Sequence, residues 1–146
     1  MVNLNNSSTG LDYNNSKDAI IENNTLKNNA IYSSHFNGVY FDNSNGNISN
    51  NNITGYGQGV SISNIKNVNI NKNTISENTG TGVSIGNSSN ISVKGNNINK
   101  NGCYPGSSAV CDGIHISNSS NVDISKNNIN NNLVYILSMV VQIMLL

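Results

Sequence analysis

The stretch Gly59–Asn78 reads GVSISNIKNVNINKNTISEN, and its pattern returns at Gly82–Asn101 and at Gly113–Asn132. Two less regular copies begin at Gly10 and Gly38. In each copy the apolar residues stand in i, i+2 pairs that are mostly β-branched, with Asn, Ser and Gly between the pairs. This alternation is typical of short β-strands with one buried face, and Asn and Gly favour the bends that join them. The repeat is roughly 22 residues long and predicts two short strands, a bend and a third short strand.

Three short strands cannot enclose a hydrophobic core alone, but coils stacked about 4.8 Å apart can pair each strand with its equivalent. We therefore expect an all-β fold, a parallel β-helix or solenoid of about five coils, over residues 1–132. Equivalent apolar residues would form interior stacks, one of which contains Leu11, Val39, Val60, Val83 and Ile114.

Asparagine makes up about a quarter of the chain and recurs in fixed slots. The slot before the third strand holds Asn24, Asn51, Asn73, Asn96 and Asn127. A second row consists of Asn15, Asn43, Asn64, Asn87 and Asn118. Because an amide has two donors and an acceptor, asparagines one coil apart can hydrogen-bond into a ladder, and asparagine also accepts the left-handed backbone of a bend. We interpret the asparagines as structural ladders and turns rather than as sugar-binding groups.

The consensus G-[VI]-x-[IF]-x-N-x-x-N-[VI]-x-[IV]-x-x-N-x-I-x-x-N covers residues 10–132. It resembles the right-handed parallel β-helix repeat of pectin-lyase-like enzymes, NosD-like periplasmic proteins and adhesin-like surface proteins of archaea and bacteria. The resemblance implies the fold and its right-handed winding. It does not imply one activity, because this fold carries lyases, hydrolases, epimerases and passive stalks alike.

Charge limits the functions that the chain can serve. Seven lysines and no arginine balance seven acidic residues, and charged residues make up only 10% of the chain. No basic patch is present for nucleic-acid phosphates or for an anionic membrane. The absence of arginine also excludes the arginine-based catalytic sites that the resemblance would imply. No spacing typical of metal ligands or of a Ser-His-Asp triad occurs, so we expect no metal and no cofactor.

Asp112 and His115 are the catalytic candidates, because an acid and an imidazole bracket the start of one strand. The stretch is similar to the Asp-Pro-His-Glu stretch of β-helix uronate epimerases but lacks its Pro and its Glu. His115 also falls in an outward slot, at the end of a candidate ligand-contact stripe that comprises Asp12, Tyr40, Ser61, Ser84 and His115. A solvent-exposed histidine on a polar stripe is the simpler interpretation.

Cys103 and Cys111 lie in the longest insertion between copies, together with the only proline. A disulfide between them would close a small ring and imply an oxidising compartment, whereas two reduced thiols are the alternative. The insertion directly precedes the His115 strand, so it could wall one side of a shallow groove over the outward stripe.

Residues 133–146 are almost wholly apolar and contain neither Asn nor Gly. Fourteen such residues are too few for a spanning helix, so a short anchor or an end cap is one interpretation. A frameshifted sixth coil is another, because the codons of Met139–Val140 read one base back encode Gly and those of Leu133–Val134 can do so. With no signal peptide after Met1, we expect a fragment of a longer array whose adjoining coils continue the stack.

The sequence thus predicts a non-enzymatic structural or adhesive module of a secreted or cell-surface protein. Its partners would be polysaccharide or other surface glycans, not nucleic acid. The alternative is a carbohydrate-active enzyme, a polysaccharide lyase, glycoside hydrolase or uronate epimerase, that uses Asp112, His115 and Asp123.

Overall fold

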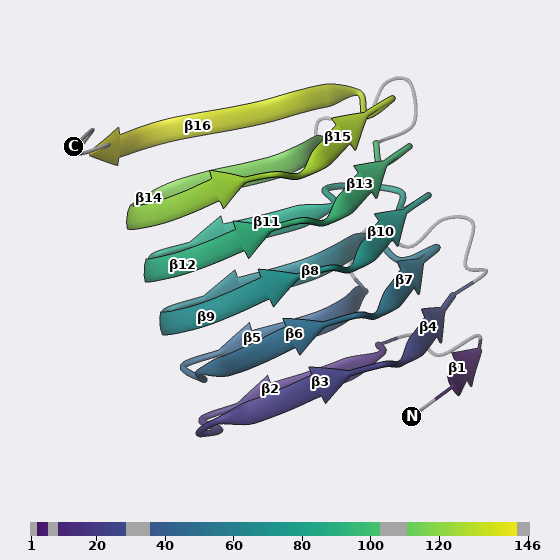
Figure 1. Ribbon diagram of the computed structural model, residues 1–146, viewed down its shortest axis with the longest axis horizontal. Helices are drawn as coiled ribbons and strands as arrows, with labels where there is room; N and C mark the ends of the chain where they lie inside the picture. Colours follow the sequence, from purple (N-terminus) through teal and green to yellow (C-terminus); the bar gives the residue numbers. More distant parts are fainter. Residues whose placement is uncertain (1–2, 6–8, 29–35, 103–110, 143–146) are drawn as a thin grey trace.

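The computed structural model describes residues 3–5, 9–28, 36–102 and 111–142. This part of the chain contains sixteen β-strands and no helix. The strands lie in stacks and every pair of neighbours is parallel, so the chain winds upward as a solenoid (Figure 1). No helix of the described residues is long and apolar enough to span a membrane.

Each stack collects the equivalent strand of successive coils. The first stack contains β2 (Leu11–Asn14), β5 (Asn37–Asp42), β8 (Gln58–Ser63), β11 (Val83–Gly86), the first half of β14 (Asp112–Ser125) and β16 (Val134–Gln142). The second contains β3 (Ala19–Glu22), β6 (Gly46–Ser49), β9 (Lys66–Asn71), β12 (Ser89–Lys94) and the second half of β14. The third contains β1 (Asn3–Asn5), β4 (Thr25–Lys27), β7 (Asn52–Thr54), β10 (Thr74–Ser76), β13 (Asn97–Asn99) and β15 (Asn128–Asn130).

The register between coils pairs the same repeat slot every time. Val60 lies between Val39 below and Val83 above, and Ile75 lies between Ile53 and Ile98. The predicted all-β parallel β-helix is therefore confirmed. Five coils are complete in the described residues, with β1 below them and β16 above.

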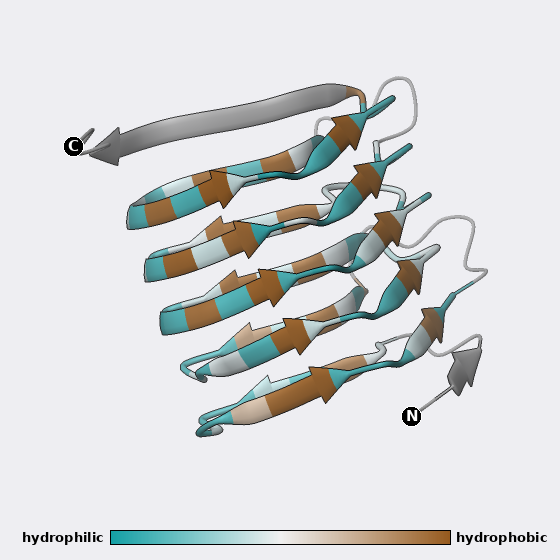
Figure 2. Cartoon of the chain, in the orientation of Figure 1, coloured by the Kyte–Doolittle hydropathy of each residue, from teal (hydrophilic) through white to brown (hydrophobic). Residues whose placement is uncertain are grey.

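Apolar residues recur at the same strand positions in successive coils (Figure 2), and together they form the hydrophobic core. In the first stack the buried column holds Val39, Val60, Val83 and Ile114, each 0% exposed. Matching columns of buried Ile, Leu and Val come from the other two stacks. Burying one Val or Ile side chain contributes about 1.5–3 kcal/mol, so the aligned columns are the main favourable term in folding.

The second corner corrects the expectation that the ladder asparagines themselves take the left-handed backbone. At the second corner, between the second and third stacks, positive φ angles of 54–65° belong to Asn23, Asn50, Lys72, Gly95 and Lys126. Each of them directly precedes a ladder asparagine. The residue with positive φ turns the chain, and the asparagine after it points its amide into the interior. The first corner does place its predicted row at positive φ, from Asn15 to Asn118.

Asparagine side chains hydrogen-bond from coil to coil, as the repeat predicts. Asn51 donates from its backbone N–H and its Nδ2 to Oδ1 of Asn73, at 2.9 and 3.0 Å. Asn73 in turn donates from Nδ2 to Oδ1 of Asn96 at 3.0 Å and to the backbone oxygen of Ile48 at 2.8 Å. The same pattern continues from Asn24 to Asn127.

A second ladder was not predicted. It lies at the third corner, where the third stack passes to the first stack of the next coil. Nδ2 of Asn78 donates to Oδ1 of Asn101 at 2.8 Å, and Nδ2 of Asn101 donates to Oδ1 of Asn132 at 3.0 Å. The signal was present, because the three asparagines occupy one repeat slot.

The start of the apolar tail forms β16, which pairs with β14 and sets Ile136 opposite Ile114. The tail therefore begins a sixth coil over the first stack. A frameshift as its origin stays a prediction.

Candidate functional site

The outward face of the first stack carries the candidate stripe. The register places Asp12 opposite Tyr40, Tyr40 opposite Ser61, Ser61 opposite Ser84, and Ser84 opposite His115. Because side chains alternate along a strand, these five lie on the face opposite the buried column. They form one file along the solenoid axis, with about 4.8 Å between successive coils.

At the lower end of the file, Tyr40 lies between two carboxylates. Burial raises the pKa of the Tyr40 phenol above its ordinary value, and the neighbouring Asp42 and Asp12 raise it further. Asp42 also accepts a hydrogen bond from Nδ2 of Asn64 at 2.8 Å. The lower end therefore offers two carboxylates as hydrogen-bond acceptors and a phenol as a donor.

At the upper end, the two catalytic candidates are in contact. Nδ1 of His115 lies 3.0 Å from Oδ2 of Asp112, and the side chains are 15% and 2% exposed. The interpretation of His115 as a solvent-exposed residue is therefore wrong. A carboxylate on Nδ1 fixes the orientation of the imidazole and leaves Nε2 as the second ring nitrogen, an arrangement suited to proton transfer.

The third acidic candidate does not join this pair. Asp123 lies in the second half of β14, where it pairs with Ser92, whereas His115 pairs with Ser84 in the first stack. The Asp123 carboxylate forms an ion pair with Lys94, and this hydrogen bond holds its pKa below the ordinary value. The repeat already assigned the two residues to different strands, because His115 stands in the first apolar pair of its copy and Asp123 in the second.

Cys111 directly precedes the Asp112–His115 pair and is 6% exposed. It is disulfide-bonded. Its predicted partner, Cys103, lies outside the described residues, so the Cys103–Cys111 pairing stays a prediction.

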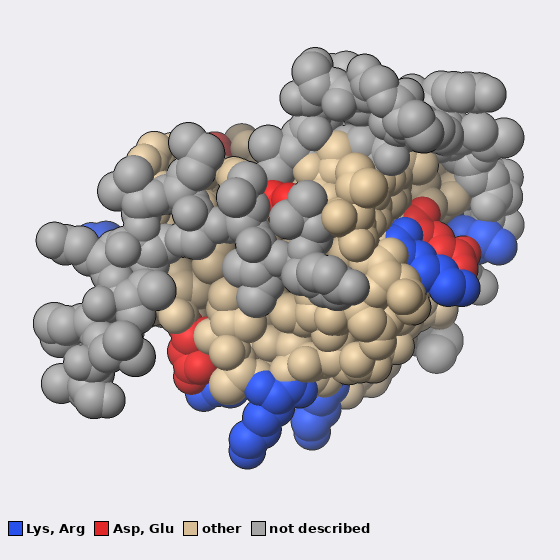
Figure 3. Space-filling model, turned by 90° about the horizontal axis from the view of Figure 1, so that it is seen from above, with Lys and Arg blue, Asp and Glu red and all other residues tan. Residues whose placement is uncertain are grey.

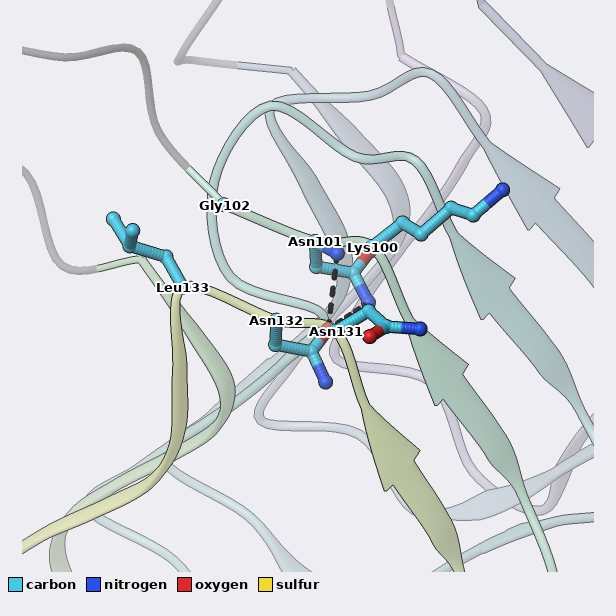
Figure 4. A pocket seen from close by; sticks show the side chains of 6 residues that line it. All are labelled: Lys100, Asn101, Gly102, Asn131, Asn132 and Leu133. Carbon is cyan, nitrogen blue, oxygen red and sulfur yellow. Dashed lines mark hydrogen bonds between the residues drawn. The ribbon is translucent and has the colours of Figure 1, made fainter.

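Two shallow hollows occur at the corners. One lies at the third corner, lined by Lys100, Asn101, Gly102, Asn131, Asn132 and Leu133. In it Asn101 donates a hydrogen bond to Asn132, and the Lys100 side chain extends away from both (Figure 4). The other lies at the second corner and is lined by Asn23, Asn24, Thr25, Asn50, Asn51, Asn52, Lys72 and Thr74.

The charged residues are sparse. Seen along the stack (Figure 3), most of the described surface is neither acidic nor basic, and charges stand in a few separate groups. Within the described residues, no group of three or more His, Cys, Asp or Glu side chains could hold a metal ion. On the described surface, the polar groups are thus mainly hydroxyls and amides, together with the Asp112–His115 pair.

Comparison with known proteins agrees with the architecture. The family described as a right-handed β-helix region matches residues 2–140. The match covers the five complete coils and extends into β16. No curated protein and no solved structure matches the chain.

Proposed function

The chain belongs to the right-handed β-helix family, and on that premise we propose that it is a rigid, non-enzymatic module that contacts glycans. It would serve a secreted or cell-surface protein. The aligned interior columns and the asparagine ladders support the rigidity, because each coil is fixed to the next by backbone and side-chain hydrogen bonds. The disulfide at Cys111 supports an oxidising compartment.

The file of outward side chains carries the proposal. Tyr40, Ser61 and Ser84 present a phenol and two hydroxyls at the strand spacing of about 4.8 Å. A sugar residue of an extended glycan has a length close to that spacing. Stacking on a tyrosine ring and hydrogen bonds from repeated hydroxyls are suited to a neutral or weakly charged polysaccharide lying along the axis.

The test is retention of the purified chain on immobilised pectin, alginate and dextran. Ser84→Arg places a bulky side chain in the middle of the file and should abolish retention on the polysaccharide that binds. Ser92→Arg introduces the same side chain on the outward face of the second stack and should leave retention unchanged. Absence of retention on every polysaccharide, or equal losses from both variants, would refute the proposal.

A second function is favoured by one observation, the 3.0 Å contact between His115 and Asp112. An oriented imidazole beside a glycan could act as an acid or base, as a lyase, hydrolase or uronate epimerase requires. Depolymerisation and epimerisation assays on pectin and alginate test this alternative. Turnover by the unaltered chain that is lost in His115→Ala, with thermal stability retained, would place the enzyme ahead of the passive module.

A further inference from the structure

At the second corner, two lysines adopt a left-handed backbone conformation that is unfavourable for lysine. Five positions with positive φ lie one above another, where the second stack passes to the third (Figure 1). Three of them are Asn23, Asn50 and Gly95, residue types that adopt this conformation readily. The other two are Lys72 and Lys126, with φ of 55° and 59°. Lysine adopts this region at a conformational cost, and strain of this kind is a reason to look for function.

Both lysines are exposed and form no ion pair within the described part of the chain. A third cation, Lys94, lies in the neighbouring slot but is engaged by Asp123. The closest acidic residue in that slot is Glu22, two coils below Lys72. The upper half of the corner therefore carries two uncompensated positive charges.

The two lysines are two coils apart, which corresponds to about 10 Å along the axis. Gly95 lies between them, and a Cβ added there would have no atom within 4 Å. In three successive coils this corner therefore holds the cation Lys72, the open space beside Gly95 and the cation Lys126.

A polar wall runs beside this column. The first residues of the third-stack strands point outward and form the file Thr25, Asn52, Thr74, Asn97 and Asn128. Together with Lys72 the lower members line the hollow of the second corner, which contains no carboxylate. The wall therefore offers one uncharged hydrogen-bonding group per coil.

We propose that the second corner binds a linear anionic polysaccharide with one carboxylate on every second sugar. The chain lies along the solenoid axis, its carboxylates meet Lys72 and Lys126, and the uncharged sugar between them occupies the space over Gly95. Hydroxyls of the sugars hydrogen-bond to Thr74 and Asn97. This inference rests on the proposed role in glycan contact but assigns a different face and a different charge pattern.

The probe is a hyaluronan oligosaccharide, which has one carboxylate per disaccharide, measured by calorimetry at low salt. Polygalacturonate, with a carboxylate on every sugar, and neutral dextran are the comparison ligands. We expect hyaluronan to bind more tightly than either, and its affinity to fall as salt is raised. Equal affinity for all three ligands, or no binding of hyaluronan, would overturn the proposal.

The variants separate binding from folding. Lys72→Asn and Lys126→Asn put the residue that this corner prefers at each position, so the thermal midpoint should stay level or rise. Each should weaken hyaluronan binding roughly tenfold, because a charge-assisted contact is lost. Gly95→Asn should fill the open space and weaken binding while the fold tolerates it, as it tolerates Asn50 in the same column.

The matched control is Lys100→Asn, at a positive φ of 54° on the third corner. It removes the same charge from the same backbone conformation and should leave hyaluronan binding unchanged. An equal loss from this control would show nonspecific charge attraction and overturn the proposal. Loss of binding in Ser84→Arg but not in the Lys72 and Lys126 variants would also overturn it, while leaving the stripe as the glycan-contact surface.

Discussion

Replacement of Asn73 by leucine tests the ladder most directly. The Asn73 side chain is part of four hydrogen bonds, two accepted from Asn51 and two donated to Ile48 and Asn96. The residue is 1% exposed, so water cannot replace the lost partners. Leucine has a similar size but no polar atom, and it leaves these groups facing an apolar side chain.

The loss in the free energy of unfolding depends on which buried polar groups keep a hydrogen-bond partner in Asn73→Leu. Nδ2 of Asn51 still donates to the backbone oxygen of Ile21, and Oδ1 of Asn96 still accepts from the Asn73 backbone. The Ile48 oxygen loses one donor but stays in the parallel ladder between β6 and β9. The Asn51 backbone N–H loses the partner that Asn73 supplied. At about 1–3 kcal/mol for a buried group left unpaired, the cost is about 1–3 kcal/mol. No left-handed strain adds to it, because the positive φ belongs to Lys72.

For a chain of this size, a cost in that range lowers the thermal midpoint by roughly 3–12 °C. The assay is thermal unfolding followed by circular dichroism, with urea unfolding as a second measure. Asn99→Leu is the matched control, since its side chain is partly exposed and bonds only to Asn97 on the same outward face. It should cost under about 0.5 kcal/mol. Equal shifts in Asn73→Leu and Asn99→Leu would show that the slots carry no positional meaning and would refute the ladder.

Three other changes test separate features. Gly55→Ala should destabilise the fold by about 2 kcal/mol or more in urea unfolding, because φ is +77° and the new Cβ would clash with the backbone oxygen of Asn28; a variant as stable as the parent would contradict this. Tyr56→Phe should raise stability by about 1 kcal/mol, since Tyr56 is 0% exposed and its hydroxyl has no hydrogen-bond partner among the described residues. Burial raises the pKa of Tyr56, so the folded state retains a proton that the unfolded state loses, and stability should fall as pH rises above about 10, less steeply in Tyr56→Phe. Lys94→Ala should return the pKa of Asp123 toward its ordinary value in an NMR titration, and an unchanged pKa would show that the ion pair does not form in solution.

The strands and their register were predictable because one pattern recurs five times. In each copy the β-branched residues alternate with polar ones, as Val60 and Ile62 do around Ser61. Burial of one face permits a single register, since a slip of one residue would expose every apolar side chain. The interior stacks follow from that register alone.

The corners were only partly predictable. An asparagine in a repeated slot can make a bend or reach inward to a ladder, and composition does not distinguish the two. The structure assigns the bend to Lys72 and the ladder to Asn73. A lysine at positive φ runs against local preference, so no propensity argument would have placed it there.

The contact between Asp112 and His115 was also beyond the sequence pattern. Strict alternation along a strand would place residues three apart on opposite faces. Asp112 is the first residue of β14, where the chain enters the coil and alternation is not yet imposed by neighbours on both sides. Its carboxylate can therefore reach Nδ1 of the outward His115.

Function in such a solenoid must be sought where a coil departs from the repeat. Each inward slot is fixed by packing, and each ladder slot is fixed by hydrogen bonds, so residues there report on folding. The outward slots of the first stack and the positive-φ slots of the second corner are neither inward nor part of a ladder. His115 replaces a serine in its file, and Lys72 and Lys126 replace asparagine or glycine in theirs. Because Lys72 and Lys126 lie outside the inward columns and the ladders, their variants should separate ligand contact from stability.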